Sequence, residues 1–182
     1  GGGSLAFSVD EWLASDAKGA DMGVGGSNPR TVCFWMFVPG GQQSESGMYG
    51  YGTRGCTDGR NNMWALRSFW GGSNYTRFRS QHWCWDPEVQ IAEGVMNRWS
   101  HVFHMYTGTN VQVYVDNGNG STVQRHDWGR TEISTGENHG VQIGRFGEET
   151  NQNRTFKGKI SDFRIYDQAL SSGDRAVIYN NG

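Results

Sequence analysis

The chain has little proline, little cysteine and no long apolar run. It holds 3 prolines and 3 cysteines in 182 residues. No apolar stretch approaches the roughly 18 residues that a membrane-spanning helix needs, so we expect no membrane span. The chain also lacks an excess of positive or negative charge, since 16 Lys and Arg against 18 Asp and Glu give a formal net charge of -2. A nucleic-acid binder needs a basic face to neutralise phosphates, so we do not expect nucleic acid as a partner.

The three cysteines are Cys33, Cys56 and Cys84, and no two have Cys-x-x-Cys spacing. This spacing gives no support to a zinc or redox site. Cys33 stands in an apolar run and is expected to be a buried core thiol. Cys56 and Cys84 lie in Gly- and Trp-rich segments, and whether they form a disulfide stays open because the count is odd.

Glycine and aromatic residues are abundant. The chain holds 28 Gly, 8 Trp, 7 Tyr and 9 Phe. Disordered chains are poor in aromatic residues, so this composition excludes an intrinsically disordered chain. A glycine-rich, aromatic-rich and proline-poor chain is typical of many short strands joined by tight turns.

Strand patterns run through the first two thirds of the chain. Residues 31–38 form a continuous apolar run ended by Pro-Gly-Gly, which predicts a strand buried on both faces or a sandwich-core strand. Residues 63–70 and 75–85 are rich in aromatics and predict two more strands. In residues 99–116, side chains alternate on both sides of a Thr-Gly-Thr-Asn turn, which predicts a hairpin with one apolar face.

The last third adds two strands and then changes its pattern. Residues 141–146 and 156–166 predict strands, while Ser171 with Asp174 three positions later predicts the start of a short helical turn. Residues 10–20 are ambiguous between a strand and a short helix. We therefore predict an all-β sandwich or jelly roll with a short C-terminal helical turn.

Three segments, in order, carry a resemblance to a known family. Residues 31–38 are similar to its early core strand with a central Trp. Residues 98–118 resemble its Trp-x-His-Val hairpin ending in Tyr-Val-Asp-Gly. Residues 143–171 closely match its ending, Phe-x-Gly-x-Ile-x-Asp-x-Arg-Ile-Tyr followed by Ala-Leu-Ser. The family is the laminin-G-like, concanavalin A-like lectin–glucanase superfamily.

This resemblance implies a two-sheet antiparallel jelly-roll sandwich, with residues 1–182 as a single domain. The superfamily contains lectins, adhesion modules, hydrolases and structural domains, so function must be argued from a site. Its glucanases often carry Glu-x-Asp-x-x-Glu on one strand, a string that is missing here. The nearest acidic cluster is Asp86, Glu88 and Glu93, which Pro87 interrupts. We therefore expect no enzyme.

The central segment has the composition of a carbohydrate-binding site. Flat aromatic rings stack on the apolar faces of sugars, and Arg and Asn side chains bond their hydroxyls. The expected ligand-binding residues are Trp70, Tyr75, Arg77, Arg79, Trp83 and Trp85. We expect Trp35, Trp64 and Trp99 to belong to the core instead. The leading hypothesis is thus a non-catalytic module that binds a glycan or glycosylated surface.

The alternative is a structural or assembly domain, such as a decoration, fibre or adhesion subunit. Aromatic and Arg residues are also enriched at protein interfaces, so the composition fits protein partners as well as sugar. Either function suggests an extracellular or surface-exposed location, secreted or on a particle.

One structural calcium ion is the cofactor that the resemblance implies. Calcium prefers several oxygen ligands, and the turn residues Asp58 and Asp116 are the candidates to supply them. A transition-metal site is not expected, because His101 and His104 are three positions apart in a strand and therefore face opposite sides.

Overall fold

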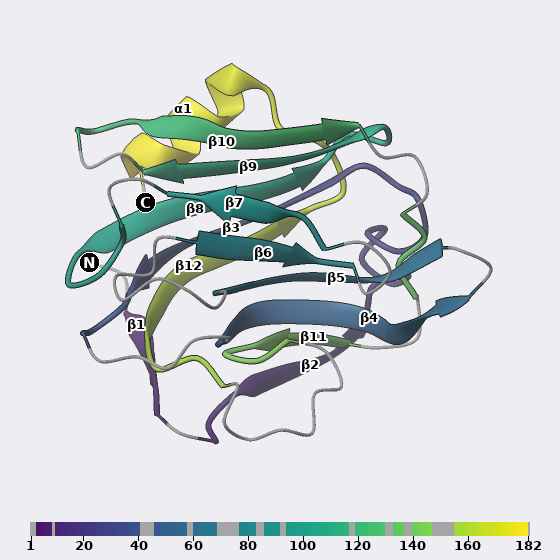
Figure 1. Cartoon of the computed structure of the whole chain (residues 1–182), viewed down its shortest axis with the longest axis horizontal. Helices are drawn as coiled ribbons and strands as arrows, with labels where there is room; N and C mark the ends of the chain where they lie inside the picture. Colours follow the sequence, from purple (N-terminus) through teal and green to yellow (C-terminus); the bar gives the residue numbers. More distant parts are fainter. Residues whose placement is uncertain are drawn as a thin grey trace.

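The chain folds into two antiparallel β-sheets that pack face to face, with one helix on the outside (Figure 1). The computed structural model describes residues 3–8, 10–40, 46–57, 60–68, 77–82, 86–91, 94–116, 119–129, 133–136, 140–146 and 155–181, and within these ranges it leaves out the side chains of residues 54, 56, 57, 60–62 and 125. The expected all-β jelly-roll sandwich with a short C-terminal helix is confirmed.

Sheet A contains the first and the last strands of the described chain. Its strands lie in the order β1 (Ser4–Phe7), β12 (Gly158–Tyr166), β3 (Arg30–Phe37), β8 (Trp99–Tyr106), β9 (Asn110–Asp116) and β10 (Thr122–Gly129). The β8–β9 pair is the hairpin predicted from residues 99–116, and its turn closes where Thr107 N–H donates to Asn110 O.

Sheet B is formed mainly by the middle of the chain. Its strands lie in the order β2 (Leu13–Lys18), β11 (Gly140–Ile143), β4 (Gly47–Thr57), β5 (Arg60–Ser68), β6 (Arg77–Gln81) and β7 (Glu88–Gln90). The ambiguous segment at residues 10–20 is thus the edge strand β2. Strands β4, β7 and β10 were not predicted.

The main core lies between the two sheets. Phe34 and Met36 of sheet A meet Tyr49, Trp64 and other fully buried side chains of sheet B. Because side chains alternate along a strand, each of these strands presents its other residues to the outer face of its sheet.

Helix α1 (Ser172–Asn181) covers part of the outer face of sheet A. Ser171 caps the helix as predicted: its hydroxyl accepts from the Asp174 N–H, and the Asp174 carboxylate accepts from the Ser171 N–H. Ile178 of α1 packs with Cys33 and Phe103 below it. This cover explains why β3 is buried on both faces, as expected, and why β8 is buried on both faces rather than one.

The tryptophans expected in the core divide into two groups. Trp64 is fully buried between the sheets, as predicted. The prediction is wrong for Trp99, which is 39% exposed, and for Trp35, which lies on the outer face of sheet A and stacks on Tyr179 of α1. Within the described ranges, no helix is long and apolar enough to cross a membrane.

Candidate functional site

Strands β5, β6 and β7 present a row of polar side chains on the outer face of sheet B. The register places Arg67 opposite Arg79, and Arg79 opposite Glu88. Arg77 and Gln81 flank Arg79 at two-residue spacing on β6, so they share its face. Asp86 precedes β7 and joins the same group. We call these six residues the Arg–Glu ladder: Arg67, Arg77, Arg79, Gln81, Asp86 and Glu88.

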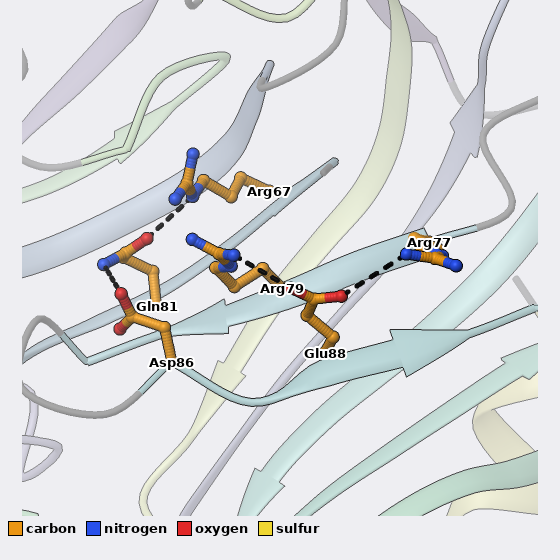
Figure 2. A network of polar contacts seen from close by, with 6 residues as sticks. All are labelled: Arg67, Arg77, Arg79, Gln81, Asp86 and Glu88. Atoms are coloured by element: carbon orange, nitrogen blue, oxygen red, sulfur yellow. Dashed lines mark hydrogen bonds and ion pairs between the residues drawn. The ribbon is translucent and has the colours of Figure 1, made fainter. Parts of the chain in front are cut away.

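Two hydrogen-bonded chains hold the ladder together (Figure 2). In the first, Arg67 Nε donates to Gln81 Oε1 over 2.7 Å, and Gln81 Nε2 donates to Asp86 Oδ2. The other oxygen of Asp86 accepts from the backbone N–H of His82. Both side-chain groups of Gln81 are therefore engaged, which fixes the orientation of its amide.

In the second chain, Glu88 lies between two arginines (Figure 2). Its Oε1 is 2.9 Å from Arg79 Nη2, and its Oε2 is 3.7 Å from Arg77 Nη1. The side chains of Arg77 and Glu88 are 42% and 39% exposed, so solvent screens these pairs and they add little to stability. Their effect is to hold charged, hydrogen-bonding groups in place at the surface.

The rest of this face is less accessible. Met63 and Ala65 of β5 form a small apolar cluster with Phe146. The guanidinium of Arg67 lies over the Phe146 ring at 5.1 Å, and Arg67 is only 6% exposed. The ladder is thus buried at Arg67 and Gln81 and open to solvent at Arg77 and Glu88.

The structure places two of the predicted ligand-binding residues in the ladder, Arg77 and Arg79. The other four, Trp70, Tyr75, Trp83 and Trp85, lie outside the described residues. Sequence analysis did not assign Arg67, Gln81, Asp86 or Glu88 to a binding site. The alternation Arg77-x-Arg79-x-Gln81 was the available signal for Gln81, whereas Glu88 is brought to Arg79 by the β6–β7 pairing.

In the described part of the acidic cluster, both carboxylates are engaged by other protein groups. A retaining glycosidase uses two carboxyls about 5–5.5 Å apart, one as acid and one as nucleophile. Here Asp86 is bound by an amide and a backbone N–H, and Glu88 by two guanidinium groups. Glu93 lies outside the described residues.

Of the two calcium candidates, the structure describes Asp116 but not Asp58. Asp116 is buried, with its Oδ1 3.9 Å from Arg98 Nη1, and its backbone carbonyl accepts from Arg98 Nη2. A guanidinium at this position opposes a cation, so Asp116 does not fit a calcium site. Asp58 lies outside the described residues, and the calcium ion stays a prediction. In the ranges that the structure describes, no three His, Cys, Asp or Glu side chains gather as a metal site.

Comparison with known proteins agrees with this architecture. The family model of the concanavalin A-like lectin/glucanases superfamily matches residues 7–174, and the chain belongs to this family. Among curated protein sequences, none matches the chain.

Solved structures of three kinds share the fold. A heptameric SAP-like pentraxin from Limulus polyphemus has a TM-score of 0.67 at 14% identity, over 97% of this chain and 81% of the pentraxin. The CBM40 of the Ruminococcus gnavus IT-sialidase has a TM-score of 0.64 at 13% identity, over 97% and 96% of the two chains. Domain 4 of the extracellular GH43 arabinanase AbnA from Geobacillus stearothermophilus, solved with arabinotriose, has a TM-score of 0.62 at 18% identity, over 98% and 87%.

Proposed function

We propose that the chain is a non-catalytic recognition module that binds a glycan or glycosylated surface through the outer face of β5–β7. The observation that carries this proposal is the Arg–Glu ladder. Arg77 and Arg79 are held at the surface by the carboxylate of Glu88, beside the buried Arg67–Gln81 pair, so they can bond hydroxyl groups with little further ordering. The arabinanase domain holds a sugar on the same fold, and a CBM40 shares it. An extracellular location, secreted or on a particle, accords with this function.

The predicted aromatic residues complete the proposed site. Trp83 and Trp85 stand in the sequence between Gln81 and Asp86, two members of the ladder. Because Asp86 follows Trp85 directly in the sequence, we propose that a sugar ring stacked on Trp85 bonds its hydroxyls to members of the ladder. We therefore keep Trp70, Tyr75, Trp83 and Trp85 as proposed stacking residues beside Arg77 and Arg79.

The test is a glycan array with the wild-type chain and four variants. Glu88→Gln removes the charge that positions Arg77 and Arg79, and Trp85→Ala removes a proposed stacking ring. Exposed ion pairs of this kind are worth about 0.2–1 kcal/mol, so we expect affinity to fall by up to about fivefold with Glu88→Gln. The matched control is Asp127→Asn on β10, whose carboxylate binds three amides on the other sheet.

The array has two outcomes that would count against the proposal. One is an unchanged binding profile in Glu88→Gln and Arg77→Ala. The other is equal loss in Asp127→Asn, which would show a general effect on the fold. Thermal melts of all variants separate lost binding from lost structure.

An assembly domain is the second candidate function. Leu5, Trp12 and Leu13, in and beside strands β1 and β2, are 47%, 41% and 45% exposed, an apolar group of the kind that protein partners cover. Light scattering distinguishes the two functions. An obligate oligomer that binds no glycan, and that dissociates on Trp12→Ala, favours assembly.

A further inference from the structure

A pocket of about 430 Å³ lies where the edge strands β1 and β2 meet, at the opposite edge of the sandwich from β7 and β10 (Figure 1). The Arg–Glu ladder lies on β5–β7, so this pocket is separate from it. Its volume falls in the range of about 300–1,000 Å³ typical of ligand sites. The walls of the pocket include Leu5, Phe7, Asp10, Glu11, Trp12 and Leu13.

The apolar floor of the pocket is a part of the core that the two sheets leave open. Leu5 of β1 pairs with Ile160, a member of the main core. Leu13 of β2 pairs with Ile143, which packs against the same core. Directly paired residues share one face of a sheet, so both leucines face the space between the sheets. Within the described ranges no further strand covers either edge, and the two leucines remain 47% and 45% exposed.

Trp12 forms an aromatic wall beside the leucines. Its side chain is 41% exposed, so part of the ring is in contact with solvent. The guanidinium of Arg145 lies over the ring, 4.7 Å from its centroid. The quadrupole of an aromatic ring attracts cations, and this contact shows that the Trp12 ring already holds one. The exposed part of the ring remains accessible to an aliphatic or cationic group from outside.

Two carboxylates stand at the rim of the pocket. Hydrogen bonds from the hydroxyl and the backbone N–H of Ser8 lower the pKa of Glu11, so Glu11 is ionised at neutral pH. Asp10 donates its backbone N–H to Thr155 Oγ1, while its exposed carboxylate forms no hydrogen bond or ion pair with any residue that the structure describes. Among the residues that line the pocket or stack on it, two negative charges thus stand against the one positive charge of Arg145.

We propose that this pocket binds a lysine side chain of a protein partner, with the ammonium at the two carboxylates and the methylene stem on the apolar floor. Lysine joins a flexible apolar stem to a compact charge, which matches an apolar floor with a negative rim. A neutral apolar side chain leaves the rim charges unpaired, and a carboxylate is repelled by them. The site deepens the second candidate function, assembly, because it names the chemistry of the partner.

The experiment follows the indole N–H signal of Trp12 by two-dimensional NMR of the whole chain, with Trp12→Phe to assign that signal. The probe is Nα-acetyl-lysine methylamide at millimolar concentration. Two neutral analogues are compared with it, Nα-acetyl-norleucine methylamide and the same lysine derivative acetylated at Nε. We expect the lysine derivative to shift the Trp12 signal in a saturable way, with an affinity about fivefold higher than that of either analogue.

The decisive variant is Asp10→Asn. Asp10 has φ +64°, a left-handed conformation that Asn also adopts, so the variant should keep the melting temperature of the wild-type chain. Its affinity for the lysine derivative should fall about threefold, toward that of the neutral analogues. The matched control is Asp16→Asn, which removes the same charge from β2 at a residue outside the pocket walls and should leave the affinity unchanged.

Three outcomes would each overturn the proposal. They are no shift with the lysine derivative, equal affinities for the three compounds, and an affinity that falls no further in Asp10→Asn than in Asp16→Asn. The glycan array and light scattering are separate measurements. A chain that binds glycans or assembles, but shows none of the lysine-dependent shifts, loses this site alone, and its proposed function stands.

Discussion

The imidazole of His104 lies flat against the indole of Trp64, with ring centroids 4.0 Å apart and planes 8° from parallel. His104 comes from sheet A and Trp64 from sheet B, so the stack joins the two sheets inside the core. Both side chains are fully buried. Burying a histidine in an apolar core is costly unless both of its nitrogens find partners.

A chain of hydrogen bonds provides those partners. Tyr49 OH lies 2.5 Å from His104 Nδ1, and Ser80 Oγ lies 2.6 Å from His104 Nε2 and 2.7 Å from His82 Nε2. His82 Nδ1 faces the carbonyl of Met63 at 3.2 Å. Since that carbonyl only accepts, His82 Nδ1 carries its proton, and the donors run in one direction from Tyr49 through His104 and Ser80 to His82. This arrangement satisfies both nitrogens of His104 as a neutral imidazole and links the two sheets.

Tyr49→Phe should therefore destabilise the fold. The change keeps the ring but leaves His104 Nδ1 without its donor, which costs about 1–3 kcal/mol in a buried site. Urea denaturation monitored by tryptophan fluorescence measures the free energy of unfolding. Tyr114→Phe is the matched control, because its hydroxyl bonds the glutamines 112 and 124 near the surface and its loss should cost less than about 0.5 kcal/mol. An equal loss of unfolding free energy in the two variants would contradict a stabilising hydrogen bond from Tyr49 to His104.

The buried histidines should make the fold weaken in mild acid. Desolvation lowers the pKa of His104 well below 6.5 and that of His101 to about 4. Between pH 6.5 and 4.5 the unfolded chain then binds more protons than the folded one, so the free energy of unfolding falls as the pH falls. The lowered pKa values of Glu11, Asp127 and Asp174 act in the same direction, but mainly below about pH 5, at the lower end of this window.

Urea titrations at several pH values between 7.5 and 4.5 test this. Each buried histidine changes the free energy of unfolding by at most about 1.4 kcal/mol per pH unit within this range. His101→Gln should give a smaller slope than the wild-type chain. A free energy of unfolding that stays constant from pH 6.5 to 4.5 would contradict the lowered pKa values of His101 and His104.

Most of the fold was predictable because local patterns determine it. The alternation in residues 99–116 and the cap at Ser171 depend on neighbours in sequence, and both are confirmed. The position of Trp35 was not predictable in this way. A residue on the outer face of a strand looks like a core residue when a distant helix covers that face, and α1 begins more than a hundred residues after β3.

The candidate site was predictable only in part, for a similar reason. Arg77 and Arg79 were identified from their place in an aromatic-rich segment. Arg67 and Glu88 join them through strand pairing, which composition does not reveal.

Cys33 should not react in the folded protein. It is a free, fully buried cysteine, and desolvation raises the pKa of its thiol to about 12. Reaction with iodoacetamide needs the thiolate and access to it, so peptide mass mapping should find Cys33 unmodified at pH 8 and fully modified in denaturant. Modification of Cys33 at the same rate in both conditions would contradict its burial. The same map without reductant tests the open question of a Cys56–Cys84 disulfide.

Gly140→Ala should detach the edge strand β2 from sheet B. A Cβ at Gly140, the first residue of β11, would lie within 1.9 Å of the Ser15 carbonyl oxygen of β2. Backbone atoms yield little, and overpacking of this kind costs about 1–3 kcal/mol or more. Hydrogen exchange should show early loss of protection in residues 13–18, while the amides of β3 and β8 stay protected. Gly129→Ala, at the end of β10, is the control, because a Cβ there meets nothing within 4 Å. Equal stability of the two variants would contradict the close approach of β11 to β2.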